Sequence, residues 1–554
     1  MINSGPNDTI GRILDLDFPR PRERLKVFES EPFAHYHNEC IRHLFSRRHG
    51  APTQVPSRAV TSATEILEPR FPDQPQQPRL SLFFAPLLWC SARVCSVWLL
   101  NSVLSTLEGS LMFLRRSLPA VVPLLAFLVL PTMGHAASVA DELNDLRDAL
   151  AFGKASGTIR YRFENVDQSS VAKDANASTL RGVLGYETKS YRGFTMFAQF
   201  EGVWAVGEDN YRSGTNGKAA ATYPLVADQP SVELQQAWAQ YACPVDPWKS
   251  AVRFGRQEIN LSNQRLVGSV AWRQDNQSFD GVGVSSMPYH EGATNLSFGY
   301  HYLNRVNRIF PDSSVTNPFQ GNLDMSTHLA QATYKLDGYG QIVAYELFLD
   351  YDGTVAAVTN NSSRTLGARA SGAYKLNDTL SALYGAEYAR QGDYGSNTNS
   401  YDAGYYQAEV GATWEELTLK YGYNVIQGDS ATDKFTTPLA TGHAFNGWAD
   451  VFLNTPNGGL NGHSLSLIYL PSMVKGLTLT GIGYIFKGES NSEHYGNELD
   501  LMADYKISQF PGLMVGVKFA RFVGDKVNSM TGASVAGATA EDLTKTMIFT
   551  QYTF

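Results

Sequence analysis

Arginine recurs in this chain within short segments of alternating polarity. In the segment TIRYRFE (158–164), Arg160 and Arg162 stand between aliphatic and aromatic residues. A guanidinium group donates a planar fork of N–H bonds that binds carboxylate oxygens in pairs. Several such cations on one surface would therefore attract an anionic solute.

Strands are the elements that would position these cations. Strict alternation of apolar and polar residues has a period of two, which is typical of a strand with one apolar and one polar face. The pattern recurs along the chain and predicts about eighteen strands, with a margin of about 2–4 residues at each boundary. The predicted strands lie near 157–166, 178–188, 193–206, 231–242, 250–258, 277–285, 294–304, 327–336, 340–351, 364–375, 379–390, 402–413, 416–427, 463–470, 476–487, 494–506, 512–523 and 544–554.

The connections between these strands alternate in length. Short ones such as KSYRG, LDGYG, KLND and PSMVK follow every second strand, whereas the longest candidates are 207–230, 259–276, 305–326, 428–462 and 524–543. Bacterial outer-membrane barrels have short periplasmic turns and long extracellular loops, and an even number of strands. The sequence therefore predicts an all-β fold, a closed antiparallel transmembrane barrel of about 18 strands. A barrel of this size leaves an aqueous interior.

Both ends of the chain fit export to the outer membrane. The segment MFLRRSLPAVVPLLAFLVLPTMGHA (112–136) has two arginines, an apolar run and small final residues, the three parts of a secretory signal peptide. The final strand ends in Phe554, which resembles the terminal signal read by the barrel-assembly machinery. We expect residues 1–111 to be over-extended translation, the alternative being a disordered or anchored extension.

A short helix is predicted between the signal peptide and the barrel. In residues 137–156 the apolar side chains of Val139, Leu143, Leu146 and Leu150 fall at helical spacing. We expect a periplasmic helix or a plug in the barrel mouth, with a mobile tail as the alternative. Residues 157–554 would form the barrel, which cannot contain a disulfide because it keeps a single cysteine, Cys243.

Composition excludes several classes of function. A net charge of -8 argues against nucleic acid as a partner, because a phosphate-binding protein needs a basic face. A mean hydropathy of -0.22 excludes a bundle of many membrane-spanning helices. The chain shows no HExxH, GxSxG or P-loop motif, so we predict neither an enzyme nor a metal or cofactor.

Energetics predict which charged residues line the pore. A lipid-facing Arg or Lys at the membrane midplane costs roughly 2–4 kcal/mol, so charges out of phase with apolar neighbours should face the lumen. Arg256 shares the parity of its apolar neighbours and should lie near an interface instead. The candidate pore-lining residues are Arg160, Arg162, Arg181, Arg253, Arg256, Arg273, Arg369, Lys518, Glu164, Glu201, Glu346 and Glu387. The alternative is that the arginines pair with inward acids, including Glu187, in structural ladders.

The segments VRFGRQEINLSNQRLVGSVAWRQDNQSFDGV (252–282) and HAFNGWADVFLNTPNGGL (443–460), with the strand NELDLMADYKI (497–507) and the terminal Phe, resemble the alginate-export family of outer-membrane porins. The resemblance covers most of 137–554. It implies a monomeric barrel of 18 strands and an arginine-rich constriction that passes an anionic polyuronate. On this resemblance Arg253 and Arg256 match the RFGRQ motif.

Three functions follow as hypotheses. The first is a porin for small or oligomeric anions, including saccharides, in the bacterial outer membrane. The second is a dedicated exporter of alginate or a related exopolysaccharide, and the third is a surface receptor or adhesin that uses its long loops. The expected partners are the solute, the barrel-assembly machinery, and the lipid and lipopolysaccharide of the outer membrane.

Overall fold

The computed structural model describes residues 139–244, 248–286, 295–310, 321–525 and 541–554. Two helices are seen in these residues, α5 (Val139–Ala151) and α6 (Ala356–Thr359). The strands are β1 (Lys154–Gln168), β2 (Ala175–Glu187), β3 (Phe194–Asn210), β4 (Ser231–Ala242), β5 (Ala251–Gln257), β6 (Ser278–Ser286), β7 (Leu296–Asn307), β8 (Leu323–Leu336), β9 (Gly340–Leu349), β10 (Ser363–Lys375), β11 (Leu380–Asp393), β12 (Asp402–Trp414), β13 (Leu417–Ile426), β14 (Leu460–Tyr469), β15 (Leu477–Lys487), β16 (His494–Lys506), β17 (Leu513–Gly524) and β18 (Asp542–Thr553).

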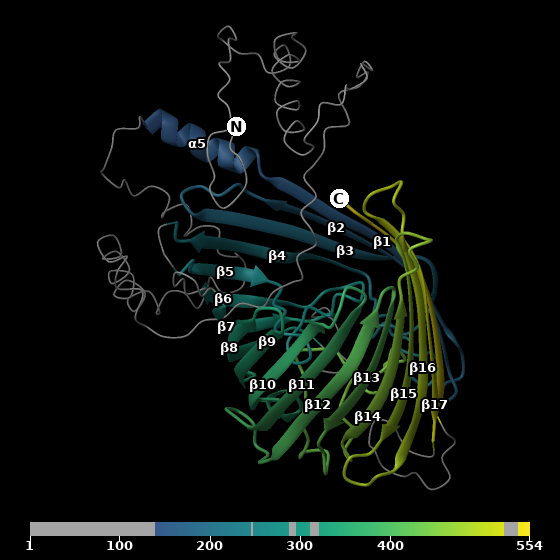
Figure 1. The fold of residues 1–554 in the computed structure, drawn as a ribbon. Coiled ribbons are helices and arrows are strands. Elements are labelled where there is room, and N and C mark those ends of the chain that lie inside the picture. Colours follow the sequence, from purple (N-terminus) through teal and green to yellow (C-terminus); the bar gives the residue numbers. More distant parts are fainter. Residues whose placement is uncertain (1–138, 245–247, 287–294, 311–320, 526–540) are drawn as a thin grey trace. The chain divides into compact units, whose positions relative to one another are not determined.

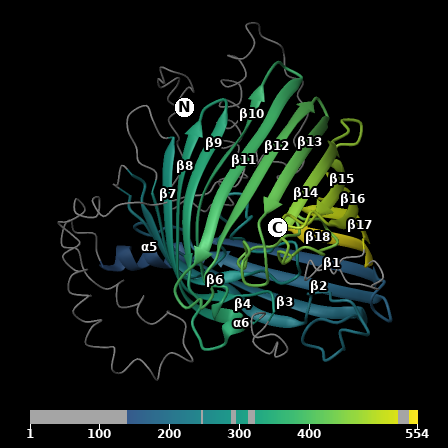
Figure 2. The same cartoon turned by 90° about the horizontal axis from the view of Figure 1, so that it is seen from below.

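The strands form one closed antiparallel sheet. Each strand pairs with the next in the sequence, and β1 closes the ring against β18 with Tyr161 opposite Thr550. Figures 1 and 2 show the successive strands side by side around the wall. The predicted 18-stranded barrel is therefore confirmed. None of the described helices is both long and apolar enough to cross a bilayer.

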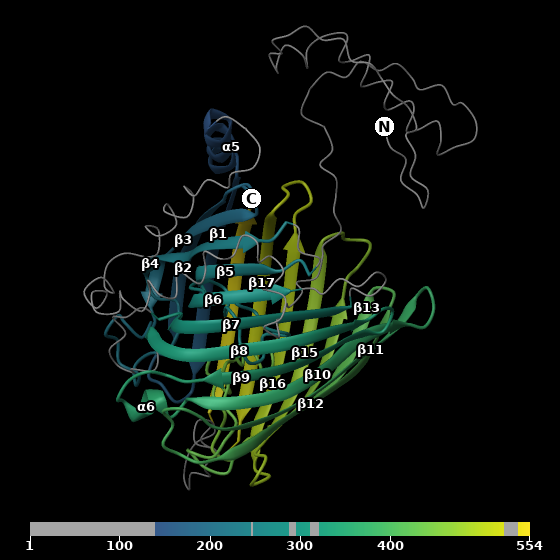
Figure 3. The ribbon, with the colours of Figure 1, turned by 90° about the vertical axis from the view of Figure 1, so that its left-hand side faces the viewer.

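The two ends of the barrel differ in their connections. One end has tight turns, such as 337–339 between β8 and β9 and 415–416 between β12 and β13, and the other has long loops such as 258–277 and 427–459. Figure 3 places α5 at one end of the strands and α6 at the other. We call the end with the tight turns, where α5 lies, the turn end, and the end with the long loops, where α6 lies, the loop end.

Helix α5 is attached to the turn end by its contacts with β2 and the β2–β3 turn. The Tyr186 hydroxyl donates to the Leu150 carbonyl oxygen at 2.8 Å, and Arg192 pairs with Glu142 at 2.7 Å. Leu143 and Leu150 are exposed in this arrangement. Whether this helix is periplasmic or a plug stays a prediction.

Alternation along the strands separates an outer from an inner face. In β16 the side chains of Leu499 and Leu501 are exposed on the outer face, whereas Glu498 and Asp500 are buried inside. The outer face is apolar because it meets lipid, so an inner face rich in charges is expected.

The loop end of the interior is packed rather than open. Fully buried apolar side chains of the loops, including Val267, Phe435 and Phe452, form one cluster with inward residues of the wall such as Tyr405 and Phe522. The alternation of charge and apolarity therefore predicts the wrong face for some residues of this half, where apolar side chains also point inward.

Candidate functional site in the lumen

Two loops from different parts of the wall meet inside the barrel. Loop 258–277 follows β5, and loop 427–459 follows β13. Val267 and Leu439 form a short parallel bridge between them, and the Gln277 side chain donates to the Leu439 carbonyl oxygen at 2.9 Å. The rings of Trp272 and His443 stack at a centroid distance of 3.4 Å. We call Trp272, Arg273, His443 and Asp450 the loop junction.

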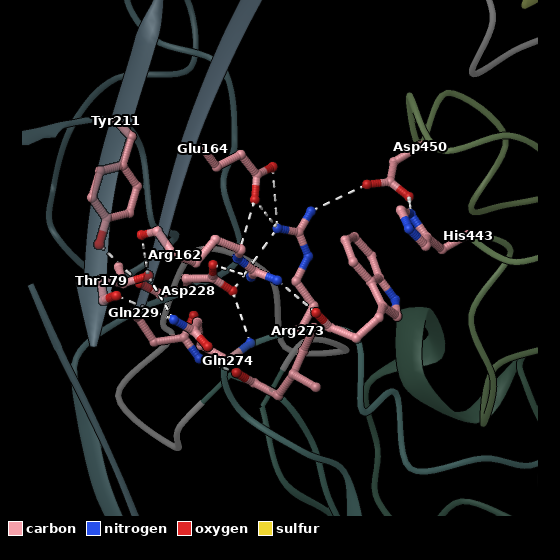
Figure 4. Close-up of polar contacts among 12 residues, drawn as sticks. Arg162, Glu164, Thr179, Tyr211, Asp228, Gln229, Arg273, Gln274, His443 and Asp450 are labelled. Carbon is pink, nitrogen blue, oxygen red and sulfur yellow. Dashed lines mark hydrogen bonds and ion pairs between the residues drawn. The ribbon is translucent and has the colours of Figure 1, made fainter. Parts of the chain in front are cut away.

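Arg273 is the central cation of the loop junction. Its side chain is 4% exposed and reaches Glu164 of β1 at 3.0 Å and Asp450 of loop 427–459 at 3.1 Å. Asp228, from loop 211–230, lies 3.9 Å from the same guanidinium group. Figure 4 shows Arg273 between Glu164 and Asp450. One arginine thus connects the wall with three loops.

The wall strand β1 supplies two more arginines to the same region. Arg160 donates to Gln274 Oε1 at 2.7 Å and to backbone carbonyl oxygens of loop 258–277. Arg162 donates to the Trp272 carbonyl oxygen at 2.6 Å and pairs with Asp228. Both side chains occupy the inward parity of β1, which they share with the buried Glu164, and both hold the loop in place.

Asp450 is bound by cations from both the loop and the wall. It accepts from Arg273, from Lys545 of β18, and from His443 Nδ1 at 2.6 Å. The other ring nitrogen of His443 lies 2.6 Å from Lys518 Nζ of β17. Asp450 is also a non-glycine residue with a positive φ of 65°, so the backbone is held in an uncommon conformation that presents this carboxylate.

Two residues of the loop junction, His443 and Asp450, have strongly shifted pKa values. Burial lowers the pKa of His443 to about 3 although Asp450 opposes this, so the ring is neutral at pH 7 and its Nε2 can accept from Lys518 Nζ. Burial also raises the pKa of Asp450, but Lys545, His443 and Arg273 outweigh it and hold that pKa well below its usual range. Asp450 is therefore a carboxylate throughout the physiological range.

A second loop acid, Asp275, differs from Asp450. Burial, with Glu233 and Glu201 nearby, raises the pKa of Asp275 well above its ordinary value. The adjacent Arg181 pairs with Glu201 at 2.6 Å, and the Glu201 carboxylate accepts from the Asn276 backbone N–H at 3.1 Å. Positive charge near this wall is thus offset by fewer ionised acids than the sequence suggests.

The turn end of the lumen contains charged residues that are more accessible. Lys420 and Glu409 form an ion pair of 3.1 Å, and each is 29% exposed. Farther from the turns, Arg369 contacts Glu387 at 3.2 Å and Gln407 at 2.9 Å, and this ion pair is less accessible, with side chains 13% and 1% exposed. These groups line a polar wall without loop residues packed onto them in the contacts described.

The alginate export family model matches residues 150–436, which is about half of the chain. The chain belongs to the alginate export family. The predicted resemblance is confirmed, and family membership together with the barrel supports an outer-membrane channel.

Solved structures share the fold of this family member at low sequence identity. OccAB2 of Acinetobacter baumannii is 14% identical with a TM-score of 0.54, covering 74% of this chain and 99% of that chain. Pseudomonas aeruginosa OpdK with vanillate is 14% identical with a TM-score of 0.53, covering 72% and 98%. One curated protein, the nitrate import ATP-binding protein NrtC of Synechococcus elongatus, is 44% identical over 48 residues. The chain spans 7% of the length of NrtC, and we infer nothing from that match.

The RFGRQ motif of this alginate export family member divides between the two faces of β5. Arg253 lies over the Trp238 ring, 3.8 Å from its centroid, and donates to Gln240 Oε1 at 2.7 Å. Arg256 pairs with Asp280 across β5 and β6. These two residues share the outward parity of the next pair along the strands, Phe254 and Val282. Although Arg256 was among the pore-lining candidates, its position matches the interface expected from its parity.

Glu346 is not a lumen residue in this structure, which corrects its prediction as pore-lining. The inward positions of β9 are Tyr345 and Leu347, which are buried in the packed loop end. Glu346 therefore faces outward, where it pairs with Arg364 at 2.6 Å. The cause is that apolar residues of β9 pack against the loops inside the barrel.

Sequence reasoning missed several residues that form the site. Asp228, His443, Asp450 and Lys545 are absent from the predicted pore-lining residues. The available signal was the HAFNGWAD stretch, which begins at His443 and ends at Asp450. This stretch carries part of the family resemblance, but its role at the loop junction depends on contacts between distant strands.

Proposed function

We propose that this protein is an outer-membrane channel for small or oligomeric anionic solutes of the uronate type. The observation that carries the proposal is the binding of Asp450. A carboxylate already lies in the lumen between Arg273 and Lys545, with the neutral His443 beside it. A solute carboxylate would meet the same donors.

The lumen carries hydrogen-bond donors at the turn end and at the loop junction. At the turn end, Arg253, Arg369 and Lys420 are partly accessible on the inner face. At the junction, Arg273 and Lys545 would exchange Asp450 for a solute carboxylate. Guanidinium forks favour this exchange because they bind any carboxylate bidentately.

The test is to measure the reversal potential of the channel current in planar bilayers across a salt gradient. Replacing Asp450→Asn removes one negative charge from the junction while keeping a side chain of similar size. We expect the anion/cation permeability ratio to rise, and oligouronate to block the current at lower concentration. An unchanged ratio contradicts the proposal. The control is Asp402→Asn, because Asp402 is on the outer face and its loss should leave the ratio unchanged.

A dedicated exporter of alginate or a related exopolysaccharide is the second candidate, and the family match favours it. An exporter gene should lie among genes for polysaccharide synthesis and epimerisation. Loss of the gene should then retain the polymer in the periplasm, whereas loss of a small-solute porin should slow uptake of that solute.

A further inference from the structure

A row of ion pairs lies on the outer face of one half of the barrel. Arg256 of β5 is opposite Asp280 of β6, Asp280 is opposite Arg305 of β7, and Arg305 is opposite Asp324 of β8. The Arg256–Asp280 pair is bidentate at 2.7 and 3.0 Å, and Arg305 reaches Asp324 at 3.0 Å. Positive and negative residues thus alternate along four neighbouring strands.

Two more pairs of arginine with an acid lie at outward positions of the next four strands, near their loop ends but out of register with Asp324. Arg364 of β10 pairs with Glu346 of β9 at 2.6 Å, and Arg390 of β11 forms a bidentate pair with Asp402 of β12. We call these eight residues of β5–β12 the outer charge row. Its four cations are all arginine, although the chain also contains lysine.

The outer charge row lies at the loop end and on the lipid-facing parity. Arg364 is the second residue of β10, and Leu366, two positions further, is 55% exposed. Arg390 is near the end of β11, and Tyr388 is exposed on the same side. An arginine at the membrane interface costs about 0–1 kcal/mol, in contrast to the midplane, so these positions suit the headgroup level of the outer leaflet.

The opposite half of the barrel has a different composition at this level. Several of its outward positions carry amides and hydroxyls, for example Asn165 opposite Asn176 and Thr546, and the strand-end ion pair seen among its described residues, His494 with Asp525, contains no arginine. Arg521 is opposite Thr544 and Leu499 rather than a carboxylate. The alternation of Arg with acid is therefore a property of β5–β12 and not of every strand end.

The pairs of the outer charge row cost little to rearrange. The side chains of Arg364 and Arg390 are 55% and 64% exposed, and exposed pairs contribute about 0–1 kcal/mol. A phosphate group offers three oxygens and more negative charge than a carboxylate, so it can share or replace the acid partner of an arginine. The released acids provide oxygen ligands for divalent cations, which bridge neighbouring phosphates.

From these features we infer that the outer charge row binds the phosphate groups of a phosphorylated glycolipid in the outer leaflet. The arginines contact phosphate, and the acids of the row hold the bridging cations. The inference rests on the outer-membrane location and is independent of which solute the channel passes.

The experiment measures glycolipid retention by native mass spectrometry of the detergent-solubilised full chain. The probes are lipid A with its phosphates and the same lipid A after phosphatase treatment, each with Mg²⁺. For the triple variant Arg305→Gln, Arg364→Gln and Arg390→Gln we expect retention of phosphorylated lipid A to fall roughly tenfold, because three charge-assisted contacts are lost. Wild type should lose retention to a similar extent when the lipid is dephosphorylated.

Matched controls keep the inference falsifiable. The double variant Arg521→Gln and Lys487→Gln removes cations from the other half and should retain lipid A as wild type does. Single-channel conductance should be unchanged in every variant, so a failure here is distinct from a failure of the proposed channel. If the triple variant lacks the heat-modifiable electrophoretic mobility of a folded barrel, the double variant Arg364→Gln and Arg390→Gln replaces it.

Four outcomes of the lipid measurement would overturn the inference. The triple variant could retain as much phosphorylated lipid A as wild type does, or the control double variant could lose as much of it as the triple variant. Wild type could also retain dephosphorylated lipid A equally well, or inorganic phosphate at the same concentration could displace the lipid completely. A row that served contact between two copies would instead change the mass of the oligomer, and this too would overturn it.

Discussion

The loop junction and the turn end of the lumen contain the same kinds of ion pair in different surroundings. Arg273 is 4% exposed and connects Glu164 with Asp450, whereas Lys420 and Glu409 are each 29% exposed. Breaking one side of a buried pair costs about 3–5 kcal/mol, because it leaves an uncompensated charge. An exposed pair contributes only about 0–1 kcal/mol.

The difference means that charge has two roles along one pore. At the loop junction the cations both bind anions and hold loops 258–277 and 427–459 in position, so permeability and local stability are coupled. At the turn end the cations affect the passing solute with little effect on the fold. Substitutions in the two regions should therefore separate structure from selectivity.

The largest expected effect is that of Arg273→Ala. Glu164, Asp228 and Asp450 would lose their shared partner, and the loop arrangement should be destabilised by about 3–5 kcal/mol. We expect higher and noisier single-channel conductance and faster proteolysis within residues 427–459. The matched change Lys420→Ala in the turn end, where the side chain is 29% exposed, should leave proteolysis as in wild type. Equal sensitivity of the two variants would mean that burial does not distinguish the two regions.

The second effect is a dependence of channel opening on pH. Burial lowers the pKa of His443 from an ordinary value of about 6.5 to about 3, so the packed loop binds a proton less well than a released loop does. The packed state is therefore fully stabilised above about pH 6.5 and loses about 1.4 kcal/mol per pH unit as the pH falls below that value. Open probability in planar bilayers should rise between pH 6.5 and 4.

The control for this pH dependence is His443→Gln. Glutamine does not titrate, and its amide can still donate to Asp450 and accept from Lys518. Its open probability should be flat over the same range, apart from the effect of other acids. A pH response identical to that of wild type would assign the proton to a different group.

Strand positions could be predicted from the sequence because they depend on local alternation. The predicted strand 494–506 coincides with β16, and 231–242 coincides with β4. Lipid outside and water inside impose opposite polarities on successive residues, so each strand carries its own signal. Closure of the barrel followed from the even number of strands and the alternation of connection lengths.

The loop junction could not be predicted in the same way. Asp450 and Lys545 are 95 residues apart, and Arg273 and Asp450 are 177 residues apart. Loops have no periodic pattern that predicts their path, and the apolar cluster that they form inside the barrel reverses the expected face of Glu346. Parity alone placed Arg160, Arg162 and Arg181 on the inner face but did not show that Asp228 and Glu201 pair with two of them.

A smaller effect is expected for Arg253→Gln. Arg253 donates to Gln240 and lies over Trp238 on the inner face, so its loss removes one positive charge with a modest loss of packing. The anion/cation permeability ratio should fall, while the heat-modifiable mobility of the barrel should be that of wild type. For comparison, Arg162→Gln should lower the ratio and also increase proteolysis of the loops.

The smallest effect is expected for the exposed pair, and it tests the comparison most directly. Glu409→Gln leaves Lys420 without its 3.1 Å partner but in contact with water, so stability should change by less than about 1 kcal/mol. The ratio should shift slightly toward anions because one negative charge is lost, and Lys420→Gln should shift it by a similar amount toward cations. High salt should remove both shifts, because exposed charges are screened over a Debye length of about 3 Å at 1 M. The Asp450→Asn shift at the buried junction should persist in the same salt, since the charges there are shielded from water by the two loops.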